Sequence, residues 1–157
     1  MQKITTFLTY DSRAEEAVEL YTSVFPNSRI LSKSYYGDAG PGDPGSVMSL
    51  NFELAGQEFV ALNAGPQFSF APGISLFVSC ETQEEVDELW EKLSEGGEKG
   101  PCGWLTDKFG VSWQIVPRQL GELLSDPDRE KAGRVMNAML GMRKLEIAGL
   151  EEAAAAR

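Results

Sequence analysis

Few of the residue types that usually perform catalysis or bind metals occur in this chain. The sequence has no histidine, which removes the commonest general base and the commonest metal ligand. Ser–His and Cys–His nucleophile pairs are therefore excluded. A zinc site would depend on carboxylates and on two isolated cysteines, Cys80 and Cys102, which lie in no metal-binding motif. We expect both cysteines to be free thiols.

One glycine-rich stretch has the spacing of a nucleotide-binding turn. Residues 40–45 read Gly-Pro-Gly-Asp-Pro-Gly, which matches G-x-G-x-x-G. The context does not fit, because two prolines interrupt the motif and residues 46–52 alternate like a strand, so no helix N-terminus follows to bind phosphate. We interpret residues 37–45 as a hairpin loop.

Composition limits the classes of partner. The 157 residues include 14 Lys+Arg and 24 Asp+Glu, a formal net charge of −10, and the basic residues are scattered. Nucleic acid and anionic membrane surfaces are therefore unlikely partners by charge, and no apolar run approaches the ~20 residues of a membrane span. The N-terminal residues lack the pattern of a signal peptide. We expect a cytoplasmic protein with a small ligand.

An internal repeat predicts how the chain is organised. Shifting the sequence by 69 positions places residues 14–21 on 83–90, with Glu-Glu, Glu-Leu and an aromatic residue in register. Apolar residues recur in both segments at helical spacing, which predicts two helices with one buried stripe each. Thr82, with Glu85 three residues later, is a candidate cap for the second helix.

Short β-prone runs precede and follow each helix. The expected strands are residues 4–10, 29–36, 46–54 and 58–63 in the first half, and 74–80, 98–101, 104–107 and 112–116 in the second. The pattern predicts an α+β fold built from two βαβββ modules, residues 1–66 and 72–117, within one domain. Residues 118–157 form a helical tail. The shift of 69 places Thr6 on Ser75.

Each module is expected to bury one face of its sheet under its helix. The other faces then need cover, so we expect the two sheets to pair and enclose a ligand cleft. Alternation places Trp113 and Ile115 under a helix and Gln114 toward the cleft. The same count directs Phe59, Ala61 and Asn63 of the first module toward the cleft. Such neutral side chains suit an uncharged or aromatic small organic molecule.

The tail carries an apolar stripe that needs a partner. Residues 125–128, Ser-Asp-Pro-Asp, are typical of a helix start. The stripe consists of Ala132, Val135, Met136, Met139, Leu140 and Met142. A methionine-rich face suits either a core or an association surface. We favour contact with a second subunit over packing within the chain.

Five stretches carry a family resemblance. They are Phe25-Pro26-Asn27-Ser28, Gly45-Ser46-Val47, Ala61-Leu62-Asn63-Ala64-Gly65-Pro66, Cys102-Gly103-Trp104-Leu105-Thr106-Asp107, and Phe109-Gly110-Val111-Ser112-Trp113-Gln114-Ile115-Val116-Pro117. Together with the βαβββ repeat, they resemble the vicinal oxygen chelate superfamily of glyoxalase I, extradiol dioxygenases, fosfomycin-resistance enzymes and bleomycin-binding proteins. Within it they look like the PhnB-like branch, often labelled 3-demethylubiquinone-9 3-methyltransferase. The resemblance implies a homodimer with a cleft in each subunit.

The resemblance also implies four positions for metal ligands in metal-dependent members. They fall on Thr6, Ala61, Ser75 and Gln114. Of these only Gln114 is a reasonable ligand, since hydroxyls are weak neutral donors and alanine donates nothing. We therefore expect no metal and no cofactor. Thr6, Ser75 and Gln114 either bind a ligand or hydrogen-bond one another inside a filled barrel.

Three hypotheses follow. The first is a metal-free protein that binds a small organic molecule through Thr6, Phe59, Ala61, Asn63, Ser75 and Gln114. The second is an enzyme of the same fold, either a metal-dependent lyase, isomerase or dioxygenase, or the methyltransferase of the family label. The third is a partner-binding protein whose cleft is filled by side chains.

Overall fold

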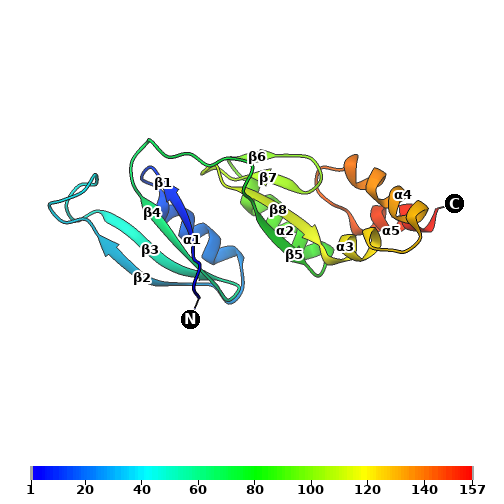
Figure 1. Cartoon of the computed structure of the whole chain (residues 1–157), viewed down its shortest axis with the longest axis horizontal. Coiled ribbons are helices and arrows are strands. Elements are labelled where there is room, and N and C mark those ends of the chain that lie inside the picture. The colour runs from blue at the N-terminus through cyan, green and yellow to red at the C-terminus, as the bar shows by residue number, and fades with distance from the viewer. Residues whose placement is uncertain (1, 157) are drawn as a thin grey trace. The chain divides into compact units, whose positions relative to one another are not determined.

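The computed structural model describes residues 2–156, which divide into two compact units, residues 2–70 and 71–156. The first contains β1 (Thr6–Tyr10), α1 (Ala14–Val24), β2 (Arg29–Tyr35), β3 (Val47–Leu54) and β4 (Gln57–Asn63). The second contains β5 (Leu76–Cys80), α2 (Gln83–Ser94), β6 (Glu98–Lys99), β7 (Trp104–Thr106), β8 (Ser112–Pro117), α3 (Arg118–Leu124), α4 (Arg129–Leu140) and α5 (Ile147–Ala155). The expected α+β fold is confirmed, and Figure 1 labels its elements.

The first unit is a four-stranded mixed sheet covered by α1 on one face (Figure 1). Its strand order is β1-β4-β3-β2, with β1 parallel to β4 and the other neighbours antiparallel. Leu50, Phe52 and Ala61 are completely buried in the core of this unit. The hydroxyl groups of Tyr10 and Tyr21 hydrogen-bond at 3.2 Å and tie β1 to α1. The apolar stripe of the helix therefore lies on the face that carries Tyr10.

The connection between β3 and β4 is a two-residue hairpin turn. Ala55 and Gly56 both have positive φ, 48° and 87°, and Leu54 pairs with Gln57. Two consecutive residues with positive φ are the signature of a type I′ turn, whose twist matches that of the strands it joins. The predicted loop over residues 37–45 is also present, since the Gly45 amide donates to the Tyr36 carbonyl at 2.7 Å.

The second unit repeats the arrangement with shorter outer strands. Its sheet has the order β5-β8-β7-β6, with β5 parallel to β8. The predicted cap of α2 is confirmed, because the Thr82 hydroxyl accepts from the Glu85 amide at 3.2 Å. Val86, Leu89, Trp90 and Leu93 form the buried stripe of this helix, as their spacing predicts.

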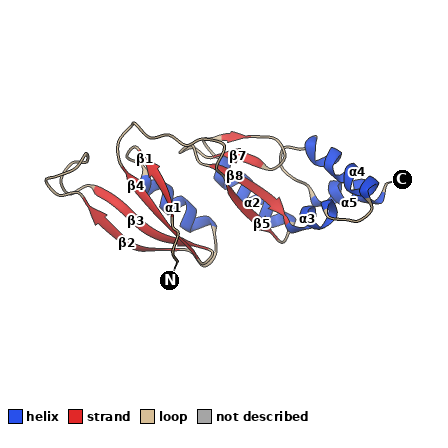
Figure 2. Cartoon of the chain, viewed as in Figure 1, coloured by secondary structure: helices blue, strands red, loops and turns tan. Residues whose placement is uncertain are grey.

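Helices α3, α4 and α5 pack at the end of the second unit, and we call residues 118–156 the C-terminal extension (Figure 2). Its core consists of Val116, Leu120, Val135, Leu145, Leu150 and Ala154. Met139 and Met142 pack against this core, whereas Met136 and Leu140 stay exposed. The expectation that the α4 stripe contacts a second subunit is wrong for Val135, which is completely buried within the same chain, and stays a prediction for the exposed Met136 and Leu140.

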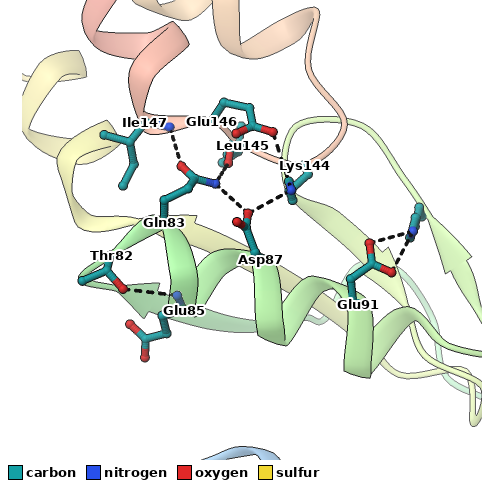
Figure 3. Close-up of polar contacts among 10 residues, drawn as sticks. Thr82, Gln83, Glu85, Asp87, Glu91, Lys144, Leu145, Glu146 and Ile147 are labelled. Carbon is teal, nitrogen blue, oxygen red and sulfur yellow. Dashed lines mark hydrogen bonds and ion pairs between the residues drawn. The ribbon is translucent and has the colours of Figure 1, made fainter.

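The segment 142–147 fastens the C-terminal extension to the module before it (Figure 3). The Gln83 side chain donates to the Leu145 carbonyl at 3.0 Å and accepts from the Ile147 amide at 2.7 Å. The Lys144 ammonium lies 2.9 Å from the Asp87 carboxylate. Hydrogen bonds from Gln83 and Lys144 lower the pKa of Asp87. These contacts bind the extension to α2 along one side of the helix.

A second set of contacts joins the same segment to the turn before β7. The amides of Cys102 and Gly103 donate to the carbonyls of Met142 and Arg143, each at 2.8 Å. Gly103 has φ +85°, and a Cβ there would lie 2.9 Å from a methyl carbon of Leu145. The glycine thus permits both the turn and the close approach of the leucine. The extension is therefore an integral part of the second unit.

Across residues 2–156, none of the helices has the length and hydrophobicity that crossing a bilayer requires.

Candidate functional site

The face of the second sheet that α2 leaves uncovered carries the residues of most chemical interest. On β8, Trp113 and Ile115 are buried beneath the helix, at 2 % and 0 % exposure, and Gln114 lies on the opposite face. This confirms the alternation expected for the strand. In the sheet register, Gln114 lies between Phe77 of β5 and Trp104 of β7. These three side chains therefore form one row across the uncovered face.

Ser75 and Gln114 are brought together as a polar pair. The Gln114 side-chain nitrogen donates to the Ser75 hydroxyl oxygen at 3.0 Å, and both residues are half-buried. Phe77 has an exposed fraction of 60 %, although large aromatic side chains are usually buried. Trp104, the third member of the row, is also uncharged. The uncovered face thus combines two aromatic rings with one neutral hydrogen-bonding pair.

The buried carboxylate of Asp107 stabilises the turn and the Trp113 ring beneath this surface. One of its oxygens accepts from the amides of Phe109 and Val111 at 2.9 and 3.0 Å, and the other accepts from the Trp113 indole at 2.9 Å. Both oxygens are therefore occupied, one by donors of the turn between β7 and β8 and the other by a side chain of β8. Asp107 fixes this turn and the Trp113 ring, which in turn set the position of Gln114 on β8.

In the first unit, the structure places the predicted site residues on the opposite face from the one expected. Phe59 and Ala61 are 5 % and 0 % exposed and lie on the face covered by α1. Asn63 shares that face, because its side-chain oxygen accepts from the Ala14 amide at the start of the helix, at 2.9 Å. Thr6 pairs with Phe59 in the sheet register and is on the same face. The expectation that these residues point away from the helix is wrong.

The error has a simple origin in the length of one connection. Between strand and helix the first unit has three residues, 11–13, and the second has two, 81–82. The helices are therefore related by 69 positions, Ala14 to Gln83, whereas the strand ends are related by 70, Tyr10 to Cys80. Because side chains alternate along a strand, a shift of one residue exchanges the two faces.

Phe7 is the position in the first unit that corresponds to Phe77. It pairs with Val60 on the uncovered face and has an exposed fraction of 58 %. Sequence reasoning missed both phenylalanines, because alternation alone reports which residues share a face and not which face the helix covers. The sequence signal that could have identified them is a large apolar residue, Phe7 or Phe77, on the side of its strand that faces away from the helix. The uncovered face of the first sheet also carries the hydroxyl pair of Ser34 and Ser49, 2.6 Å apart.

A pocket of about 430 Å³ lies within the first unit, near the start of α1 and the loop over residues 37–46. Its lining includes the carboxylates Asp11, Glu15 and Asp43. Asn63 also lines it, but its amide nitrogen donates to the Val47 carbonyl at 3.1 Å while its oxygen caps α1. Asn63 therefore holds helix and sheet together, and the carboxylates give the pocket a negative character unlike the surface around Gln114.

The four positions implied for metal ligands do not fit a metal. Thr6 and Ala61 lie on the face beneath α1, and Ser75 and Gln114 supply only neutral oxygen and nitrogen donors. Divalent metals of this superfamily need imidazole or carboxylate ligands for charge and basicity. In the part of the chain that the structure describes, no three His, Cys, Asp or Glu residues are grouped to hold a metal ion.

The two cysteines occupy different environments. Cys80 is fully buried at the end of β5, and burial raises the pKa of its thiol to about 12. Cys102 is half-buried and has φ 56°, an unusual conformation for a residue other than glycine. Both are free thiols. Cys80 is therefore a core residue and not a nucleophile.

Comparison with known proteins identifies the family. The sequence profile described as 3-demethylubiquinone-9 3-methyltransferase matches residues 2–116. The chain belongs to the PhnB-like family of the vicinal oxygen chelate superfamily. A PhnB protein from Bacillus cereus, described as a putative 3-demethylubiquinone-9 3-methyltransferase, is 44 % identical, with a TM-score of 0.67. The match covers 74 % of this chain and 99 % of that one.

More distant structures share the fold. A Pseudomonas aeruginosa protein of 21 % identity has a TM-score of 0.63 over 74 % of this chain and 98 % of its own. The fosfomycin resistance protein FosX from Listeria monocytogenes, solved with Mn(II) and sulfate, has 18 % identity and a TM-score of 0.51 over 72 % of this chain and 90 % of its own. No curated protein matches the chain. The family match ends at residue 116, so the C-terminal extension lies outside it.

Proposed function

We propose that this PhnB-like protein binds a small, uncharged organic molecule on the uncovered face of its second sheet, without a metal. The observation that carries the proposal is the row of Phe77, Gln114 and Trp104, with Ser75 bonded to Gln114. Binding surfaces for small molecules combine apolar and aromatic contacts with a few placed polar groups. A row without charge favours a neutral ligand, because an ion would lose its hydration there without a counter-charge in contact with it.

The proposal revises the predicted set of ligand-binding residues. Ser75 and Gln114 remain in it, and Phe77 and Trp104 join them. Thr6, Phe59 and Ala61 are better explained as part of the layer between the first sheet and α1. The sequence expectation that the two sheets enclose a cleft stays a prediction.

Gln114→Leu and Thr6→Val form a matched pair of variants that tests the assignment. Each replaces a polar side chain on a β-strand by an apolar one of similar volume, Gln114 in the second sheet and Thr6 in the first. A panel of neutral bicyclic aromatic compounds is titrated into each full-length protein and followed by two-dimensional ¹⁵N NMR. Gln114→Leu is expected to weaken the best binder at least tenfold and Thr6→Val to leave it unchanged. Equal affinity in wild type and Gln114→Leu would contradict the proposal.

Each alternative enzyme function would require a bound metal or cofactor. A metal-dependent lyase, isomerase or dioxygenase would carry about one metal ion per chain, and the Mn(II)-bound fosfomycin resistance protein is an example of a metal-bound protein with this fold. A methyltransferase would bind S-adenosylmethionine, yet the G-x-G-x-x-G stretch at 40–45 leads into strand β3 and offers no helix N-terminus. Plasma mass spectrometry after incubation with zinc, nickel, iron and manganese is expected to find no stoichiometric metal. A retained equivalent would support the enzyme instead.

We also propose that the protein is a homodimer. The support is the family resemblance and the exposure of Phe7 on the first sheet, at 58 %. Large exposed apolar side chains on sheet faces are typical of surfaces that become covered. Light scattering after size exclusion is expected to give twice the chain mass of 17.2 kDa. A mass of one chain at all concentrations would contradict it.

Both free cysteines are consistent with the cytoplasm, which we propose as the site of action. Fractionation of the source cells is expected to find the protein with the soluble cytoplasmic fraction, and a membrane or secreted fraction would contradict this.

A further inference from the structure

We infer that the ligand of this surface is a planar aromatic molecule whose edge carries an adjacent N–H donor and C=O acceptor, as in a lactam or cyclic imide. The inference rests on the proposed function and names the ligand class of the same site. It follows from what the Ser75 and Gln114 pair offers and from the rings on either side.

The polar pair offers hydrogen-bond donors beside an acceptor. The Gln114 nitrogen donates one of its two hydrogens to the Ser75 oxygen at 3.0 Å, which leaves the Gln114 carbonyl oxygen to accept, and the second amide hydrogen and the Ser75 hydroxyl hydrogen to donate. If the amide were turned over, Ser75 would donate to the Gln114 oxygen, and the Gln114 NH₂ would donate outward while Ser75 accepted. Either orientation presents at least one donor beside an acceptor. The complementary ligand edge is therefore an amide-type N–H and C=O.

The rings on either side set the thickness of the ligand. Phe77 and Trp104 lie on the strands that flank β8, so two strand spacings of about 4.8 Å place their backbones about 9.6 Å apart. Aromatic rings pair with centroids about 4.5–7 Å apart, so backbones at this spacing, with side chains that stand perpendicular to the sheet, leave room for one ring between them. A flat ligand can then contact both aromatic side chains while its edge meets Gln114.

The neutral character of the row excludes a charged head group as the recognition element. The uncovered-face neighbours on the same strands, Ser79, Thr106 and Ser112, are also uncharged. A carboxylate or phosphate would find no cation in this row, and the carboxylate of Glu98, which pairs with Thr106 from the edge strand β6, lies outside the row. A lactam satisfies both hydrogen bonds of the pair without bringing a charge to the sheet.

Carbostyril, a planar bicyclic lactam, and N-methylcarbostyril, which lacks the N–H donor, form the test pair of probes. Each is titrated into the full-length protein, with the resonances of Phe77, Trp104 and Gln114 followed by NMR. Carbostyril is expected to bind at least tenfold more tightly than its N-methyl derivative. Ser75→Ala and Gln114→Leu are each expected to reduce this preference at least threefold, and Ser79→Ala, on the same strand face as Ser75, to preserve it.

The outcomes separate this inference from the proposed function. If the two probes bind this face equally, or if neither binds while other neutral aromatics do, the ligand class is wrong and the binding surface stands. If no neutral aromatic compound shifts these resonances, both the ligand class and the proposed binding surface are wrong. A preference for carbostyril that survives both Ser75→Ala and Gln114→Leu would also overturn the inference, since the recognition would then lie elsewhere.

Discussion

Leu145 and Leu140 allow a matched test of how the C-terminal extension is built. Leu145 is completely buried in the core of the extension, and its side chain packs against Gly103. Leu140, at the end of α4, is 59 % exposed. The same substitution, leucine to alanine, therefore removes the same atoms from a buried and from an exposed position.

The expected free-energy costs differ by a factor of at least three. Leu→Ala in a core removes the transfer free energy of the side chain and leaves a cavity, and costs about 3–5 kcal/mol. At the exposed position most of the transfer term is absent, and alanine is the better helix former, so the cost is below about 1 kcal/mol. For a protein of this size a loss of ~3 kcal/mol lowers Tm by about 6–12 °C.

Tryptophan fluorescence during urea unfolding reports on the relevant unit. Trp90, Trp104 and Trp113 all lie in residues 71–157, so the signal follows the second unit alone. Leu145→Ala is expected to lower the urea midpoint strongly without changing the slope, and Leu140→Ala to leave both nearly unchanged. Equal costs at the two positions, or a cost below about 1 kcal/mol for Leu145→Ala, would refute the packing described for the extension.

Three further predictions concern individual groups. Asp107→Ala removes the acceptor of three hydrogen bonds, two of them buried, and is expected to lower the free energy of unfolding by about 3 kcal/mol in urea titrations, whereas a loss below about 1 kcal/mol would contradict the role given to this carboxylate. The lowered pKa of Asp87 means that its stabilisation is present above about pH 4 and is lost as the pH falls through the folded pKa, so Asp87→Asn, which weakens the contact with Lys144, should cost about 0.5 kcal/mol at pH 7 and nothing once the group is protonated. A cost that is independent of pH would argue against this ion pair. Because its pKa is raised to about 12 and it is buried, Cys80 should resist iodoacetamide at pH 8 in the folded protein while Cys102 reacts, and mass spectrometry that finds two labels on native protein would contradict this.

The arrangement of the second module follows largely from local sequence signals. The apolar spacing of α2, the Thr82 cap and the alternation along β8 each predicted what the structure shows. Trp113 and Ile115 are long apolar residues on one side of a strand, and a face that carries two such residues is normally the covered one. Gln114 was therefore placed correctly from the sequence.

The first module shows where the same reasoning fails. Phe59, Ala61 and Asn63 were assigned to the uncovered face by alternation, and Thr6 by extending the repeat from the helices into the strands. Helices tolerate an insertion in the preceding connection without changing their buried stripe, whereas a strand register that is wrong by one exchanges its faces. The offset of Tyr10 and Cys80 reveals this only once both strand ends are known.

The packing of the C-terminal extension could not be predicted from the stripe on α4. A row of apolar residues shows that a face is covered but does not show what covers it. The partner is the segment 142–147 with α3 and α5, and its attachment depends on Gln83 and on the turn at Gly103, both distant in sequence. These long-range contacts leave no periodic signal.

The most direct test of the binding surface is to locate where a neutral aromatic ligand contacts the protein. Assigned ¹⁵N and ¹³C NMR spectra of the full-length chain, recorded with and without the best-binding compound, give that location. The largest shifts are expected at Phe77, Trp104 and Gln114, including the side-chain amide of Gln114. Largest shifts at the pocket lined by Asp11 and Asp43, or a bound compound that leaves the Gln114 amide unmoved, would contradict it.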